Sequence, residues 1–142
     1  MQGKSFVKAL QGEQEPEDWR KASYYRYWMH MAHRMGNPAH FGIRTKDYKL
    51  IFYYGADYTN VHNNQEVTGK DGNRYWDSTP PGWELYDVAK DPNEMFNQYS
   101  NPEYQEIIAE LKQLLKEKRR EIGDTDDAYP RIREIVDAHW DE

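Results

Sequence analysis

The sequence contains no cysteine, and this absence excludes several classes of protein at once. Without cysteine there is no disulfide scaffold, no thiolate-bound zinc or iron–sulfur centre and no thiol nucleophile. No apolar run approaches the roughly 20 residues that a membrane helix requires, and no signal-peptide pattern opens the chain. Basic residues are outnumbered, 19 against 25 acidic ones, and the net charge of −6 argues against a protein that binds nucleic-acid phosphates.

Aromatic side chains, in contrast, are abundant. They make up 15% of the 142 residues, with 12 Tyr and 5 Trp, although hydrophobic residues reach only 37%. Disordered chains are poor in Tyr and Trp, so the composition favours a folded domain, and the length suits a single one. We predict one domain over 1–142, made of a lead-in (1–21), a sheet region (22–100) with a long polar loop (55–82), a helix (101–123) and an acidic tail (124–142).

The pattern of apolar residues predicts strands in the first part of the chain. Residues 49–54 are apolar on both faces, which is typical of a central strand covered on both sides. A short polar turn at 46–48 precedes them and indicates a hairpin. The predicted strands are 22–29, 40–45, 49–54 and 83–88, and a short helix over 5–10 is expected to stop at Gly12.

The clearest predicted element is a helix over 102–122, in which apolar residues recur at helical spacing. Asn101 can cap its first turn, Pro102 suits the first helical position, and Gly123 is expected to end it. A second, weaker helix is predicted over 130–139. Strands followed by a long helix describe an α+β fold, a small four-stranded antiparallel sheet packed against one long C-terminal helix.

The run Asp91-Pro92-Asn93-Glu94 lies between the last strand and the long helix. Asp at a capping position, Pro after it and Glu three residues later form a capping-box pattern. We predict that Asp91 caps a new helical turn and that Glu94 returns to the capping residue. The predicted role is structural, because the motif turns the chain after the strand.

Positive charge gathers between residues 25 and 50, where five basic residues face one acid, so this stretch carries +4 and the remainder −10. Such a stretch in an acidic domain is typical of an anion site, and the alternative is a solvated strand surface. His40 and Arg44 lie four residues apart on a predicted strand and share a face. Arg donates two parallel hydrogen bonds to sulfate or carboxylate oxygens, unless Arg44 pairs with an acid of its own domain.

Other candidate residues have simpler explanations. His30 and His33 have a spacing that a metal could share, but Gly36 and Pro38 interrupt regular structure and no carboxylate accompanies them. We expect loop histidines and no metal site. The Trp residues could stack on sugar rings, or could cover the sheet and form a docking surface; these are Trp28, Trp76 and Trp83.

Four segments resemble the C-terminal part of sulfatases. The ELYDV run at 84–88, followed by DPNE at 91–94 and Asn97, resembles a stretch near the end of those enzymes. Residues 40–51 resemble the family's strand pair with its G-I-R-T and Y-K-L-I motifs. Residues 1–6 resemble the segment that follows the large catalytic domain, and 18–25 also fit. The resemblance covers about residues 1–122 and is strongest to bacterial sulfatases of sulfated glycans, of the N-sulfoglucosamine type.

The resemblance implies that the chain is a C-terminal subdomain without its catalytic domain. In the family, that missing domain carries a formylglycine made from Cys or Ser in a C/S-x-P/A-x-R motif, together with a calcium ion. Here Ser78 has the downstream proline, but Gly82 stands where arginine is required, so neither catalytic residues nor a metal site are expected in this chain. The subdomain would support the fold and line the substrate cleft, with His40 the first candidate, followed by Arg34 and Arg44.

The expected partners are the N-terminal catalytic domain and a sulfated oligosaccharide. Family membership also implies a periplasmic or otherwise exported enzyme. The alternative hypothesis is a free-standing carbohydrate-binding or interaction module without catalytic activity. An isolated subdomain should expose an apolar docking patch, whereas an independent module should be a monomer with its own affinity for glycans.

Overall fold

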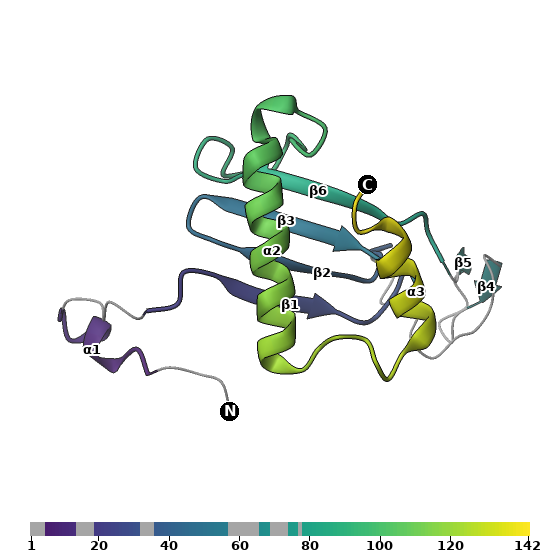
Figure 1. Cartoon of the computed structure of the whole chain (residues 1–142), viewed down its shortest axis with the longest axis horizontal. Coiled ribbons are helices and arrows are strands. Elements are labelled where there is room, and N and C mark those ends of the chain that lie inside the picture. Colours follow the sequence, from purple (N-terminus) through teal and green to yellow (C-terminus); the bar gives the residue numbers. More distant parts are fainter. Residues whose placement is uncertain (1–4, 14–18, 32–35, 57–65, 69–73, 77) are drawn as a thin grey trace.

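The computed structural model describes residues 5–13, 19–31, 36–56, 66–68, 74–76 and 78–142. Four antiparallel strands form the main sheet in the order β1-β2-β3-β6, and α2 and α3 both lie on one face of it (Figure 1). The α+β fold predicted from the sequence is therefore confirmed. The strands are β1 (Ser23–Tyr27), β2 (His40–Arg44), β3 (Tyr48–Tyr53), β4 (Glu66–Thr68), β5 (Arg74–Trp76) and β6 (Gly82–Asp87), and the helices are α1 (Val7–Leu10), α2 (Gln105–Ile122) and α3 (Pro130–His139).

The four predicted strands correspond to β1, β2, β3 and β6. The β2–β3 hairpin closes at the predicted turn, where the amide of Thr45 donates to the Tyr48 carbonyl at 2.9 Å. β3 lies between β2 and β6 as predicted, but the helices cover only one of its two apolar faces among the described residues. The predicted loop 55–82 contains the β4–β5 hairpin, which lies apart from the main sheet (Figure 1).

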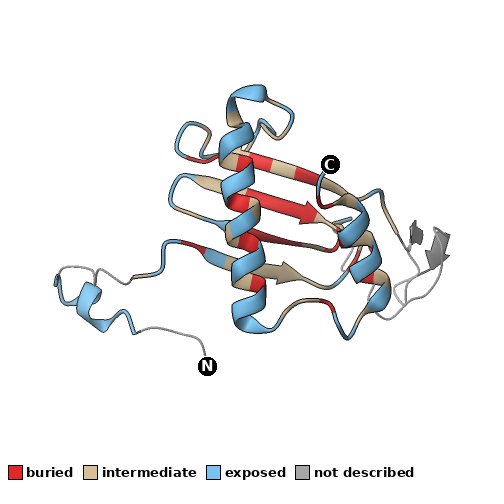
Figure 2. Cartoon of the chain, in the orientation of Figure 1, coloured by how far each residue is buried: buried red, intermediate tan, exposed pale blue. Residues whose placement is uncertain are grey.

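The core lies between the main sheet and the helices. Alternate residues of β2, β3 and β6 point toward the helices and are buried beneath them (Figure 2), and Gly42 and Ile51 on the opposite face are buried as well. Among the described elements no helix covers the opposite face of the sheet. The sheet residues of the core are Phe41, Ile43, Leu50, Phe52, Trp83 and Leu85.

The long helix begins and ends where its sequence predicts. A 3₁₀ turn (Pro102–Tyr104) precedes α2, and the Asn101 side chain accepts a hydrogen bond from the Glu103 amide at 3.1 Å. Gly123 ends the helix in the left-handed conformation, with φ of 73°. A residue without Cβ adopts this conformation at no steric cost. The buried stripe of α2 comprises Ile108, Leu111, Leu115 and Arg119.

The segment after α2 packs back onto the sheet through α3. Ile132, Val136 and Trp140 are buried in the same core as α2. The indole of Trp83 on β6 donates to the carbonyl of His139 at 3.0 Å. The predicted helix at 130–139 is confirmed.

Four charged side chains, three of them buried and that of Asp124 partly exposed, join β1 to the chain between α2 and α3. The Arg26 guanidinium lies 2.6 Å from both the Asp124 and the Asp126 carboxylates, and Arg119 also pairs with Asp126. The Arg26 guanidinium also stacks on the Trp28 ring at 3.6 Å. Two positive and two negative charges balance, which is what buried charges require.

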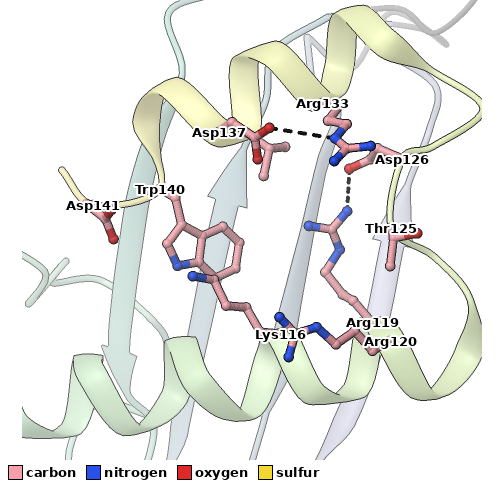
Figure 3. A pocket seen from close by; sticks show the side chains of 10 residues that line it. Lys116, Arg119, Arg120, Thr125, Asp126, Arg133, Asp137, Trp140 and Asp141 are labelled. Carbon is pink, nitrogen blue, oxygen red and sulfur yellow. Dashed lines mark hydrogen bonds and ion pairs between the residues drawn. The ribbon is translucent and has the colours of Figure 1, made fainter.

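A hollow of about 310 Å³ lies beside these charges, between α2 and α3 (Figure 3). Arg119 and Asp126 point toward each other at its wall, and Arg133 reaches Asp137 at 3.7 Å. Most of its charged side chains thus already have partners of opposite sign. We interpret this hollow as part of the packing of α3 rather than as a binding site.

The predicted capping box at 91–94 is wrong in its details. Asp91 does accept hydrogen bonds, from the amides of Met95 at 2.7 Å and Phe96 at 2.9 Å, but these residues form a turn and no helix begins there. Glu94 has a positive φ of 54°, and its side chain leaves the turn to pair with Lys49. The motif still turns the chain after β6, as predicted.

Asn97, the last residue of that motif, covers the outer edge of β6. Its side-chain oxygen accepts from the Leu85 amide at 3.0 Å and from the Tyr99 amide at 2.9 Å. The Gln98 amide donates to the Leu85 carbonyl at 2.7 Å. Edge strands expose unpaired backbone groups that invite aggregation, and this segment satisfies them.

Candidate functional site

The candidate site lies on the sheet face opposite α2 and α3, here called the helix-free face. Strand alternation places one set of side chains there, and the register between strands makes them neighbours. They comprise Tyr25 and Tyr27 of β1, His40, Gly42 and Arg44 of β2, Lys49, Ile51 and Tyr53 of β3, and Gly82, Glu84 and Tyr86 of β6.

Gly42 at the middle of β2 allows the aromatic layer to form. A Cβ at this position would lie 2.5 Å from the Tyr25 hydroxyl oxygen and 2.6 Å from the Leu50 carbonyl oxygen. The ring of Tyr25 therefore folds directly over the glycine backbone. This packing helps to bury the neighbouring Ile51, which is only 4% exposed although no described helix covers it.

His40 lies among three tyrosine rings at one end of this face. Its ring centroid is 5.5 Å from that of Tyr27, with which it stacks, 5.0 Å from that of Tyr53 and 6.0 Å from that of Tyr25. Burial lowers the pKa of His40 below its ordinary value. Nδ1 lies 2.8 Å from the Pro38 carbonyl oxygen, an acceptor, so Nδ1 carries the proton of the neutral ring. Nε2 is then a hydrogen-bond acceptor.

Glu84 on β6 accepts hydrogen bonds from two tyrosines. Burial and the Glu84 carboxylate together raise the pKa of Tyr53, and they raise the pKa of Tyr86 to about 12. The Tyr86 hydroxyl donates to Glu84 at 3.0 Å. Both phenols are therefore neutral at physiological pH. Neither is a nucleophile, but each can hold a ligand by hydrogen bonding or through its ring.

A hollow of about 380 Å³ opens beside His40, at the beginning of β6. Tyr53 and Pro38 line it, and the same two residues contact His40. Gly82 also lines it, and a Cβ built there would meet nothing within 4 Å. The hollow and His40 therefore share two neighbouring residues, although His40 does not itself line the hollow.

Arg44 lies at the other end of the same face. Its guanidinium is 3.5 Å from Glu94, which Lys49 also contacts at 2.5 Å. At about 3.3 Å per residue, Arg44 lies roughly 13 Å along the strand from His40. The two predicted site residues share a face, but a single sulfate group could not contact both. Arg34, the third, lies outside the described residues.

The basic stretch at 25–50 does not form one patch. Arg26 is buried on the helix side with Asp124 and Asp126, and Arg44 and Lys49 share Glu94. His30, expected as an exposed loop residue, is instead buried, and its Nδ1 accepts from the Ala39 amide at 3.2 Å. That expectation was wrong, and His33 lies outside the described residues.

Sequence reasoning missed Tyr53 and Glu84 as site residues. Both lie on strands that it predicted, and alternation assigns each of them a face. Their proximity to His40 depends on the register of three strands, which no local pattern gives. The three tryptophans named above lie in different places. Trp83 is buried in the core, the Trp28 ring stacks against the Arg26 guanidinium, and Trp76 belongs to β5.

Across the described parts of the chain, no cluster of three or more His, Asp or Glu side chains could hold a metal ion. The sulfatase resemblance implies calcium in the catalytic domain, and the residues described here offer no such cluster for it. None of the described helices has the length and apolar character needed to cross a membrane.

The architecture and the comparisons define the class of this protein. The fold is that of an α+β accessory domain, a sheet with helices on one face and an aromatic site on the other. The family model for the C-terminal domain of N-sulphoglucosamine sulphohydrolase matches residues 1–78 and 57–121. The chain belongs to this family of sulfatase C-terminal domains.

Individual relatives agree with this assignment. An N-acetylglucosamine-6-O-sulfatase of Bacteroides thetaiotaomicron is 35% identical over 89% of this chain and 18% of its own length. A chain solved in complex with its substrate, D-glucosamine-2-N,6-O-disulfate, is also 35% identical, with a TM-score of 0.64, over 88% of this chain and 21% of its own. A 2-O GAG sulfatase shares the fold, at 23% identity and a TM-score of 0.59, over 93% of this chain and 24% of its own. The chain thus spans about a fifth of the length of these relatives.

Proposed function

We propose that this chain serves as the C-terminal subdomain of a sulfatase that hydrolyses sulfate groups of sulfated glycans, with the N-terminal catalytic domain as its partner. Membership of the family supports this proposal, as do the relatives that act on sulfated glucosamine. Formylglycine and calcium would belong to the catalytic domain, because this chain has neither the formylglycine motif nor a described metal cluster. Export to the periplasm or an equivalent compartment is part of the same proposal.

The role proposed for this chain is to support the catalytic domain and to line the substrate cleft with the His40 end of the helix-free face. The observation that carries this role is the neutral His40, held among three tyrosines beside an open hollow. Nε2 would accept a hydrogen bond from a hydroxyl or N–H group of the glycan, away from the sulfate that reacts. Arg34 and Arg44 stay as further candidates for contact with the substrate.

Kinetics of the full-length enzyme test this role. We expect His40→Ala to lower kcat/KM for a sulfated oligosaccharide by about tenfold, the effect of losing roughly 1.4 kcal/mol of binding. Turnover of a small aryl sulfate, which has no further sugar to contact His40, should stay within twofold. An equal loss on both substrates would indicate damage to the fold, and no loss on either would exclude His40 from the cleft.

Arg44→Ala serves as the companion variant. It removes a half-exposed charge on the same face, about 13 Å from His40. If the cleft extends along the whole face, Arg44→Ala should also lower kcat/KM for long oligosaccharides while leaving a disaccharide unaffected. If only the His40 end lines the cleft, Arg44→Ala should behave as the unmodified enzyme with every substrate.

The alternative function is a free-standing carbohydrate-binding module, which the aromatic helix-free face favours. Titration of the 142-residue chain with sulfated oligosaccharides, followed by Trp fluorescence, separates the two. Tight and specific binding by this chain alone supports the module. Weak binding, together with no turnover of an aryl sulfate by the chain, is the result expected for a subdomain.

A further inference from the structure

The hollow at the beginning of β6 has the composition of a small-ligand site. Three cyclic residues outside the core line it: Tyr53 from β3, and Pro38 and Pro80 from the loops at the end of the sheet; Trp83 also borders it, although its side chain is buried in the core. Ligand sites typically combine such apolar walls with a few polar groups that fix orientation. A pyranose ring fits this description, because it has C–H groups on its faces and hydroxyls around its rim.

The polar groups of the hollow determine which saccharides it can accept. Glu84 and Asn97 lie at its wall, and among the described residues that line it Glu84 alone is charged. The neighbouring phenol of Tyr53 is neutral, because burial and Glu84 raise its pKa. A carboxylated or sulfated ring would therefore meet the negative charge of Glu84.

We propose that this hollow is a subsite for an uncharged saccharide ring, the neighbour of the sulfated residue in the glycan. The proposal rests on the function proposed above and deepens it. It specifies sulfated glycans in which the adjacent sugar is a neutral hexose or N-acetylhexosamine rather than a uronic acid. Glu84 would accept hydrogen bonds from the ring hydroxyls while it holds Tyr53 and Tyr86 in place.

Nuclear magnetic resonance of the ¹⁵N-labelled 142-residue chain tests the subsite directly. We expect galactose and N-acetylglucosamine to shift the amide signals of residues 82–84 and the side-chain amide of Asn97, and glucuronate to do so at least fivefold more weakly. Gly82→Leu fills the hollow and should abolish the shifts. Since a Cβ at Gly82 meets nothing within 4 Å and its φ is not in the left-handed region, this variant should fold, and Gly82→Ala is its matched control.

Glu84→Gln tests the electrostatic part of the argument. Gln keeps an acceptor oxygen for the tyrosine hydroxyls but removes the charge. The variant should bind glucuronate about tenfold more tightly than the unmodified chain does. Its affinity for galactose should stay within about twofold of that of the unmodified chain. The proposal is overturned if glucuronate binds the unmodified chain as tightly as galactose does. It is also overturned if the amide shifts persist in Gly82→Leu.

The subsite and the proposed sulfatase function can fail separately. If the full-length protein hydrolyses sulfated glycans but the chain shows no shifts with uncharged sugars, the subsite is refuted and the function stands. If the shifts appear and depend on Gly82 and Glu84, but the full-length protein has no sulfatase activity, the saccharide site stands and the function is refuted.

Discussion

The buried charges that join β1 to the chain after α2 should dominate the stability of this domain. The perturbation is Arg26→Met, which keeps much of the side-chain volume and removes the charge. Arg26 is only 4% exposed and lies 2.6 Å from two carboxylates, one of which is 1% exposed. Its removal leaves two negative charges, the buried one of Asp126 and the partly exposed one of Asp124, facing one remaining positive charge, that of Arg119.

The magnitude follows from this imbalance. Removing one partner of a buried ion pair typically destabilises a protein by about 3–5 kcal/mol, because the other charge remains buried without compensation. The guanidinium also lies 3.6 Å from the centre of the Trp28 ring, and this contact is lost as well. We therefore expect a loss of about 3–5 kcal/mol, a large share of the 5–15 kcal/mol typical of a whole domain.

Urea unfolding of the 142-residue chain, followed by Trp fluorescence, measures the loss. Arg133→Met is the matched control, since it removes the same charge from a residue that is 57% exposed and pairs with exposed acids. It should cost less than about 1 kcal/mol. In the double variant Arg26→Met/Asp126→Asn the charges balance again, so its cost should be smaller than the sum of the two single costs. A cost for Arg26→Met no larger than that of the control would refute the reasoning.

Three further predictions concern the sheet. The hydrogen bonds that Asp87 accepts lower the pKa of its carboxyl group. The stability that the ionised carboxylate adds is therefore present above about pH 4 and is lost as the pH falls through the lowered pKa. The difference in unfolding free energy between the unmodified chain and Asp87→Asn should be about 1–3 kcal/mol at pH 7 and much smaller near pH 2. Gly42→Ala should cost more than about 2 kcal/mol in urea unfolding, because its Cβ would lie 2.5 Å from the Tyr25 hydroxyl oxygen, whereas Gly82→Ala should cost less than about 1. The ring of His40 should titrate below pH 6.5 and carry its proton on Nδ1 when neutral, which ¹⁵N chemical shifts of the ring report; a midpoint above 6.5 would contradict the burial argument.

Local patterns in the sequence were sufficient to predict the main elements of the fold. The helical spacing of apolar residues, Asn101 before α2 and Gly123 after it gave the bounds of the long helix to within one short turn. The apolar residues on both faces of β3 predicted its place inside the sheet. These features depend on residues that are close together in the chain, and they can therefore be predicted from the sequence alone.

The candidate site could be predicted only in part, because its remaining features depend on contacts between distant residues. Alternation correctly places His40 and Arg44 on one face, but the tautomer of His40 depends on the Pro38 carbonyl and its burial depends on tyrosines from two other strands. The partner of Arg44 is 50 residues away. Glu94 occupies the last position of a capping-box sequence, yet its carboxylate pairs with Lys49 of β3 instead.

The same long-range contacts change the meaning of the positive charge between residues 25 and 50. In the sequence this stretch is a basic segment of an acidic chain, but Arg26, Arg44 and Lys49 each find a carboxylate from a later part of the chain. A sulfate group would have to compete with Glu94 for Arg44, and it would find a neutral His40 and an anionic Glu84 at the other end of the face. Recognition at that end should therefore depend on aromatic rings and neutral hydrogen bonds, while the cations that bind the reacting sulfate would lie in the catalytic domain. If this division of roles is right, the affinity of the 142-residue chain for oligosaccharides should change little with ionic strength, whereas a sulfate site built on free cations would weaken steeply as salt is added.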